Sequence, residues 1–198
     1  MSRETAAMGK LSLRTANLIG RFSRDRRANA AIEFAFVVPL MLALFFGTVE
    51  FSSGVAASRK VTLVARTLSD LVSQSSSVTD TDLTNFNTTG RAIMNPFSLT
   101  NLNTRVSQIY VDPATLTGKV IWSKGTGMAD RTANSSIAVP TALQVGGTYL
   151  IYSEVNYRYV PAVGYMMDKA GVALSDQTYT RPRISLCVLY NSASVCGT

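Results

Sequence analysis

An uninterrupted apolar run constrains this chain more than any other feature. Every residue from Phe34 to Phe46 is apolar, and the twenty positions from Ala30 to Val49 contain a single ionisable side chain, Glu33. A helix of twenty residues is about 30 Å long, which is the thickness of the hydrocarbon core of a bilayer. The sequence therefore predicts a membrane-spanning helix.

Two alternatives remain open for the apolar run. A basic region followed by apolar residues also describes a secretory signal peptide, and the small residues 55–57 could provide a cut site, releasing a secreted binding protein that starts near Ser58. The apolar part of a signal peptide is about 7–15 residues long, however, which is shorter than this run. The other alternative is a buried core helix, although a soluble helix with no polar face over this length is unusual.

The positive charge of the chain is concentrated ahead of the apolar run. The formal net charge is +7 over 198 residues, and residues 1–32 hold seven basic side chains against two acidic ones. By the positive-inside rule, this distribution places the N-terminus in the cytoplasm and exports the C-terminal part. A basic tail can also bind nucleic acid, but no nucleic-acid motif accompanies this one. The lipid bilayer, with its anionic headgroups, is the expected partner, and nucleic acid is not.

The residues around Glu33 resemble a known processing site. A basic leader, a small residue, four residues and then Glu33-Phe34 at the start of an apolar helix is similar to the pattern of type IV pilin-like proteins, and residues 30–39 resemble the TadE family. That family comprises minor pilins or pseudopilins of the tight-adherence (Flp) type IVb pilus system. The resemblance implies three kinds of partner: a prepilin peptidase, other pilin-like subunits and the Tad inner-membrane platform.

The resemblance also implies a cleavage position. Laid on this sequence, the prepilin peptidase cut falls between Ala28 and Asn29, although the family pattern has glycine where this chain has Ala28. After a cut, the new α-amino group of Asn29 and the carboxylate of Glu33 lie at i and i+4 on one helix face. In an apolar bundle, the amine of a neighbouring subunit can supply the countercharge and set the register between subunits. The alternative is that Glu33 is solvated at headgroup level.

The helix is expected to change character along its length. Pro39 removes one backbone hydrogen bond inside the span and predicts a kink. Glu50, at the far end of the apolar run, is expected to be solvated. Beyond it, apolar residues recur every three or four positions from Val61 to Val72, with polar side chains that include Ser69 on the other faces. This pattern predicts an amphipathic continuation that ends near residue 73.

The rest of the chain predicts a second helix followed by strands. The residues 80–83 can cap the second helix, and Asn95-Pro96 closes it. Residues 105–111 and 119–123 predict a hairpin, and alternation makes residues 149–159 the clearest strand. Residues 184–190 predict the last strand, whereas residues 163–174 carry no clear pattern. The single tryptophan, Trp122, is expected in the core.

The two cysteines predict a disulfide. Cys187 and Cys196 both lie in the part assigned to export, where an oxidising compartment joins cysteines. A closed loop of about ten residues stabilises a fold by roughly 2.5–3 kcal/mol in the chain-entropy model. The alternative is a buried thiol at Cys187 and a free one at Cys196.

The residue types available argue against catalysis. The chain has no histidine, so it contains no Ser-His-Asp triad, Cys-His pair or histidine-bearing zinc site, and two cysteines cannot form a four-thiolate site. The carboxylates of the exported part follow no catalytic spacing and are expected to be solvated surface acids: Asp112, Asp130, Glu154, Asp168 and Asp176. We expect no enzyme activity, no cofactor and no metal.

Together these features predict an α+β protein, with a long N-terminal hydrophobic helix followed by an exported domain built on a mainly antiparallel sheet. The expected segments are a basic cytoplasmic leader (1–28), a transmembrane pilin-like helix (29–54), an amphipathic helix and linker (55–78) and a periplasmic domain (79–198). The resemblance implies a TadE-like minor pilin or pseudopilin in Flp/Tad pilus assembly, anchored in the inner membrane. The alternative is a permanently anchored, unprocessed periplasmic adaptor of an envelope or secretion complex.

Overall fold

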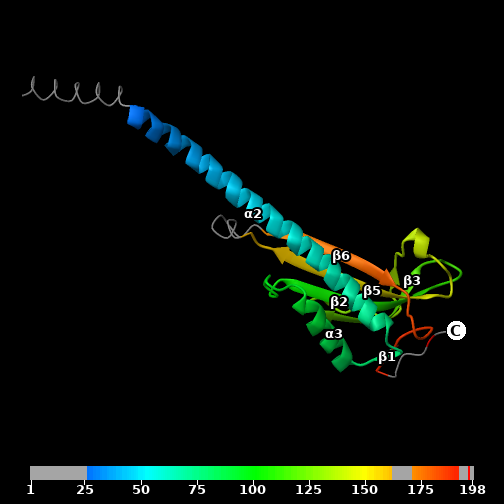
Figure 1. Ribbon diagram of the computed structural model, residues 1–198. Coiled ribbons are helices and arrows are strands. Elements are labelled where there is room, and N and C mark those ends of the chain that lie inside the picture. Colours follow the sequence, from blue (N-terminus) through cyan, green and yellow to red (C-terminus); the bar gives the residue numbers. More distant parts are fainter. Residues whose placement is uncertain (1–25, 162–170, 192–195, 197–198) are drawn as a thin grey trace, which may run out of the picture. The chain divides into compact units, whose positions relative to one another are not determined.

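A computed structural model describes residues 26–161, 171–191 and 196, with side chains described from residue 30 onward (Figure 1). Two units divide the chain, Met1–Val49 and Glu50–Thr198. Helix α2, Arg26–Ser73, begins in the first unit and ends in the second. The helix therefore ends at the residue expected from its apolar pattern. The predicted segments 1–28, 29–54, 55–78 and 79–198 stay predictions.

The second unit is built on a five-stranded sheet with the strand order β4-β3-β2-β5-β6 (Figure 1). Its strands are β2 (Leu102–Val111), β3 (Gly118–Thr126), β4 (Ser136–Ile137), β5 (Tyr149–Tyr159) and β6 (Val172–Thr180). Every neighbouring pair is antiparallel. The α+β class, the β2–β3 hairpin and the strand β5 are confirmed. The hairpin strands extend a few residues beyond the predicted ones.

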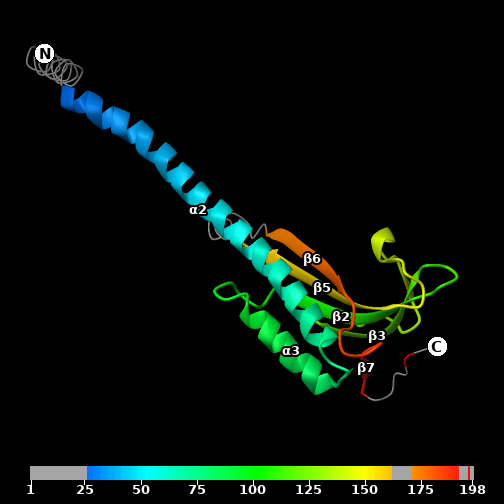
Figure 2. The same ribbon diagram turned by 45° about the vertical axis from the view of Figure 1, so that its right-hand side comes forward.

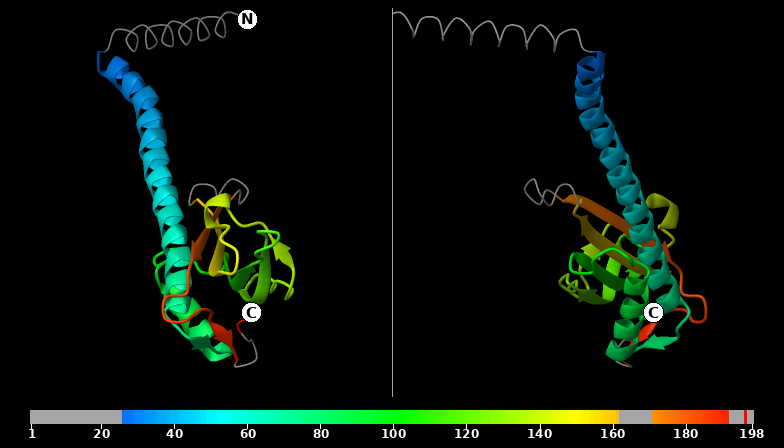
Figure 3. Two further views of the ribbon diagram at one scale, coloured as in Figure 1. Left: turned by 90° about the vertical axis from the view of Figure 1, so that its right-hand side faces the viewer. Right: turned by 60° about the vertical axis from the view of Figure 1, so that its left-hand side comes forward.

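The second half of α2 and helix α3 (Asp80–Ala92) pack on one face of this sheet (Figures 2 and 3). Val61, Val64, Leu68 and Val72 of α2 are all buried in the main core, as their spacing predicts. Ser69 was expected on a polar face, and this prediction is wrong. Its side chain is fully buried, and its Oγ donates a hydrogen bond of 2.7 Å to Thr180 Oγ1 on β6.

Helix α3 begins with a reciprocal cap. Thr79 Oγ1 accepts the backbone N–H of Asp82, while the Asp82 carboxylate accepts the backbone N–H of Thr79. Each bond satisfies a donor that the helix itself leaves unpaired. The capping residue is therefore Thr79, immediately before the residues from which the sequence predicts the cap. Just after the C-terminal end of α3, Met94 is buried and contributes to the core.

The other face of the sheet carries a smaller apolar cluster. Ile109, Val111 and Leu150 are fully or almost fully buried there, beneath the segment that contains β4 and the short 3-10 helix η1 (Thr141–Leu143). Trp122 belongs to the main core instead, with 4% of its surface exposed, as expected. Both faces of the central strands are thus covered at this end of the sheet.

The C-terminal part of the chain departs from the sequence prediction in two ways. Strand β6 pairs along its length with β5. It was not predicted as a strand: its first residues, 172–174, lie in the stretch without a clear pattern, and no element was predicted for residues 175–180. The predicted strand 184–190 is wrong except for β7 (Leu189–Tyr190), which pairs in parallel with β1 (Ser77–Val78). Residues 162–170 of the unpatterned stretch lie outside the described part of the chain.

Long-range hydrogen bonds explain why the C-terminal segment is not a longer strand. The backbone N–H of Val188 donates to Gln108 Oε1 at 2.6 Å, and its carbonyl accepts from Trp122 Nε1 at 2.9 Å. Side chains of the sheet therefore satisfy the backbone groups that a neighbouring strand would otherwise bind. The buried Cys187 next to it is joined to Cys196, so the predicted disulfide is confirmed.

Candidate membrane anchor and assembly segment

The first half of α2 presents its large apolar side chains to its surroundings. Phe36 is 77% exposed and Leu44 is 64% exposed. The most apolar window of the helix has a mean hydropathy of 2.2, and none of that window is buried. Apolar side chains in contact with water are unfavourable, so this segment requires lipid or other helices around it. Within the described part of the chain, α2 is the one helix with the length and composition of a membrane span.

The residues of the predicted processing site all lie in the first turns of α2. Ala28 and Asn29 belong to the helix, and Glu33 lies one turn after Asn29. The side chains of Glu33 and Phe34 are both exposed. The helical spacing brings positions 29 and 33 onto one face. The structure contains no neighbouring subunit, so the cut and the charge pair remain predictions.

Pro39 lies inside α2, six residues after Glu33. Proline has no backbone N–H to donate, so the carbonyl one turn earlier in the helix lacks its helical hydrogen bond. The helix nevertheless runs from Arg26 to Ser73 as one element. The kink at Pro39 therefore remains a prediction.

Glu50 follows the apolar run directly and was expected to be solvated; it is partly exposed and also has a partner in the protein. Its Oε1 accepts a hydrogen bond of 3.0 Å from the hydroxyl of Tyr159, at the end of β5. Burial raises the pKa of Tyr159, and the hydrogen bond to the Glu50 carboxylate raises it further. The tyrosine therefore stays protonated and donates at neutral pH. This hydrogen bond joins residues 109 positions apart. It connects the end of β5 to the part of α2 that begins the second unit.

Glu154 was expected to be a solvated surface acid, and this prediction is wrong. The Glu154 side chain is only 14% exposed, and it accepts hydrogen bonds from Arg105 Nε at 2.7 Å and Arg131 Nη2 at 2.8 Å. The Arg131 guanidinium also lies 5.7 Å from the ring centre of Tyr152. Both carboxylate oxygens are engaged by cations, which suits a structural ion pair better than a general acid or base.

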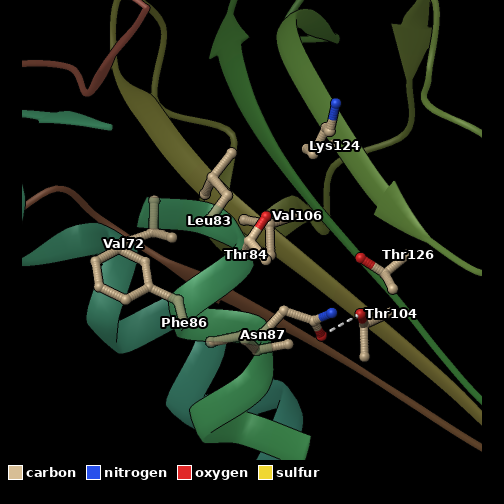
Figure 4. Close-up of a pocket in the computed structure, with 10 residues that line it drawn as sticks. Val72, Leu83, Thr84, Phe86, Asn87, Thr104, Val106, Lys124 and Thr126 are labelled. Atoms are coloured by element: carbon tan, nitrogen blue, oxygen red, sulfur yellow. Dashed lines mark hydrogen bonds between the residues drawn. The ribbon is translucent and has the colours of Figure 1, made fainter. Parts of the chain in front are cut away.

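A pocket between α3 and the sheet carries the remaining polar side chains of interest. Figure 4 shows Asn87 of α3 turned toward Thr104 of β2, and their side chains are joined by a hydrogen bond of 2.8 Å. Lys124 of β3 lines the same pocket, and its Nζ lies 3.0 Å from Asp80 Oδ1. Hydrogen bonds from Tyr190, Lys124 and Asn191 hold the pKa of Asp80 down to about 2. Asn87, Thr104 and Lys124 of this pocket thus each have a protein partner.

Metal coordination finds no support in the described residues. Across residues 26–161, 171–191 and 196, no group of three or more His, Cys, Asp or Glu side chains is arranged to hold a metal ion. Asp112 pairs with Lys119, and Asp130 accepts a hydrogen bond from the backbone N–H of Gly125 at 2.6 Å. Asp168 lies outside the described part of the chain.

The fold and the apolar helix define an α+β protein with a candidate N-terminal membrane anchor. Residues 29–69 match the family model of the TadE-like proteins. This match confirms the resemblance predicted from residues 30–39 and is confined to the N-terminal helix. The match covers α2 from Asn29 nearly to its end and none of the sheet. No curated protein and no solved structure matches the chain.

Two of these contacts had no signal in the local sequence. Glu50 and Tyr159 are 109 positions apart in the chain, and Glu154 meets Arg105 only because β2 and β5 pair in the register that sets them opposite each other. The alternation in residues 149–159 predicts which face Glu154 occupies, but not its partners. A search for an arginine on a neighbouring strand that could lie opposite Glu154 is the signal that could have found the second contact.

Proposed function

We propose that this protein is a TadE-like minor pilin or pseudopilin that takes part in Flp/Tad pilus assembly. Helix α2 holds it in the inner membrane, with the N-terminus in the cytoplasm and the sheet domain in the periplasm. The observation that carries this proposal is the coincidence of the TadE-like match at residues 29–69 with a helix whose large apolar side chains are exposed. The TadE-like match and the N-terminal apolar helix both fit a membrane-anchored pilus component.

The proposed mechanism is mechanical and not catalytic. The apolar helix stores the subunit in the bilayer and then packs against the helices of other pilin-like subunits on the Tad platform. A prepilin peptidase cuts between Ala28 and Asn29, and the new amine and Glu33 then pair between neighbouring subunits. In an apolar bundle an unpaired carboxylate is costly, so this pairing selects one register.

Burial within the second unit favours retention of the helix over release by signal peptidase. A cut after residue 57 would remove Glu50 and Ala57, yet Ala57 is fully buried in the main core and Glu50 binds Tyr159. Loss of these contacts would leave a gap beside β5. This supports an anchored protein over a secreted one.

A second candidate function is a permanently anchored, unprocessed adaptor of an envelope or secretion complex. The observation that favours it is Ala28, which stands where the peptidase pattern has glycine. Both functions use the same helix as an anchor. They differ in whether the first 28 residues are removed.

Intact-mass and N-terminal analysis separates the two functions. The full chain is expressed with its cognate prepilin peptidase and, in parallel, without it. We expect a mature start at Asn29 that requires the peptidase, is blocked in Ala28→Leu and is enhanced in Ala28→Gly. The matched control Ala31→Leu places the same side chain beyond the cut and should be processed normally.

Other products would overturn the proposal. A full-length, membrane-bound product in the presence of an active peptidase that processes Ala28→Gly would establish the adaptor. A start near Ser58 would exclude both anchored functions.

A further inference from the structure

An apolar groove lies at the end of the second unit that contains Glu50. It is formed by the first turns of α2 after Val49 and by the adjoining ends of β5 and β6, which lie beside α2 in Figure 2. Its lining is almost entirely apolar. We call five of its residues the apolar ledge: Phe51, Val55, Tyr159, Pro161 and Val172. Phe51 is 75% exposed and Val172 is 53% exposed. Contiguous exposed apolar side chains mark a surface that has a partner.

The apolar ledge begins directly after the apolar run in the chain. Glu50 follows Val49 directly, so Phe51 is the second residue after the apolar run and Val55 is the sixth. Tyr159 is bound to Glu50 and is paired in register with Val172, so both strand residues lie near the same level. If the span ends at Val49, these residues of α2 are the first to leave the hydrocarbon core and to meet a headgroup region about 5–8 Å thick.

We propose that the apolar ledge rests in the headgroup region of the leaflet from which α2 emerges, and that its partner is the lipid surface itself. Phe51 and Val172 contact the boundary between the headgroups and the acyl chains, and Tyr159 occupies the zone where aromatic residues with one polar end are favoured. This inference rests on the proposed membrane anchoring. It gives the exported domain a defined seat on the membrane before any assembly step.

Depth-dependent fluorescence quenching tests the seat in the full chain. Single cysteines are introduced into protein with the native disulfide intact, labelled with an environment-sensitive fluorophore and reconstituted in phosphatidylethanolamine–phosphatidylglycerol vesicles carrying spin-labelled lipids. The test position is Val172→Cys. Leu44→Cys reports insertion of the span, and Val145→Cys is a control of similar exposure near the start of β5. Val145 lies near the first residue of β5 and Val172 is paired with its last residue. The eleven residues of β5 extend over about 33 Å.

We expect strong quenching at Val172 by lipids labelled near the headgroup, quenching at Leu44 by lipids labelled deep in the acyl chain, and none at Val145. If Leu44 is quenched while Val172 behaves like Val145, the seat is overturned and the anchor stands. If Leu44 is not quenched, the anchor fails and the seat fails with it. Protection of Val172 from aqueous iodide without lipid quenching would assign the ledge to a protein partner and overturn the proposal.

A second variant removes the concern that the label itself creates the contact. With the fluorophore at Ala173→Cys, Val172→Asp places a charge on the ledge, and Val145→Asp is the matched control. We expect Val172→Asp to reduce quenching by headgroup-labelled lipids at least threefold and Val145→Asp to leave it unchanged. Equal quenching in both variants would count against the seat.

Discussion

Two arginines hold the carboxylate of Glu154 in a half-buried site on the sheet. Burial by itself raises the pKa of this carboxyl, but hydrogen bonds from Arg105 and Arg131 outweigh the burial, and the net pKa is lowered. A carboxyl with a depressed folded-state pKa contributes stability above its unfolded pKa, near 4.3. That contribution is lost as the pH falls through the folded-state pKa.

We expect Glu154→Gln to lower the free energy of unfolding by about 1–3 kcal/mol at pH 7, because a neutral amide replaces charge-assisted hydrogen bonds. The difference between the native protein and the variant should stay constant down to about pH 5 and then shrink as the pH falls through the lowered folded-state pKa of Glu154, because the carboxyl becomes protonated in the native protein. Urea unfolding of the detergent-solubilised chain, followed by Trp122 fluorescence, measures this. The control Asp176→Asn should change stability little, and a pH-independent difference for Glu154→Gln would contradict the charge-based explanation.

At the scale of elements, the contact between α2 and α3 depends on one glycine. Gly90 is buried in α3, and a Cβ atom added there would lie 3.1 Å from Leu68 Cδ2 of α2. That separation is tighter than ordinary van der Waals contact. Glycine weakens a helix by about 1 kcal/mol relative to alanine, so the close approach of the two helices explains its presence in the middle of α3.

Gly90→Val should therefore destabilise the second unit by about 1–3 kcal/mol, because the branched side chain forces the helices apart. Thr88→Val introduces the same side chain on the exposed face of α3 and controls for helix propensity. Thermal unfolding monitored by circular dichroism compares the two variants. Similar melting temperatures would show that the α2–α3 contact yields at little cost.

At the scale of the whole molecule, two halves of one helix have different surroundings. Leu42 in the first unit and Leu63 in the second are almost equally exposed, at 49% and 50%. The residues around Leu42 are apolar, whereas the helix around Leu63 has one buried face and carries Arg59 and Arg66 on its exposed face. Exposure alone does not distinguish the two positions, but the surrounding sequence assigns one to lipid and the other to water.

We expect Leu42→Arg to impair membrane integration, because an arginine near the centre of a span costs about 2.5–3.5 kcal/mol. Leu63→Arg should leave integration unchanged. The measurement is the fraction of full-length chain that stays with membranes after alkaline extraction. Equal retention of both variants would argue against a span at residues 30–49.

Local pattern predicted much of this fold. The apolar run, the amphipathic continuation to Ser73 and the alternation in residues 149–159 each report on neighbours a few residues apart, and all three elements are present. Strand β6 was missed because an edge strand is paired on one side only and can be largely polar. For the candidate site, the sequence supplied Ala28, Asn29 and Glu33 as predictions, but not the contact of Glu50 with Tyr159.

The sequence by itself determined the apolar anchor, the likeness to TadE at its start and the presence of two cysteines that can pair. Each of these depends on composition or short spacing, which needs no knowledge of the fold. Only the tertiary structure decided that Val188 is held by Gln108 and Trp122, and that Glu154 lies between two arginines. Those contacts join residues far apart in the chain, so they exist only once strand order and register have brought their elements together.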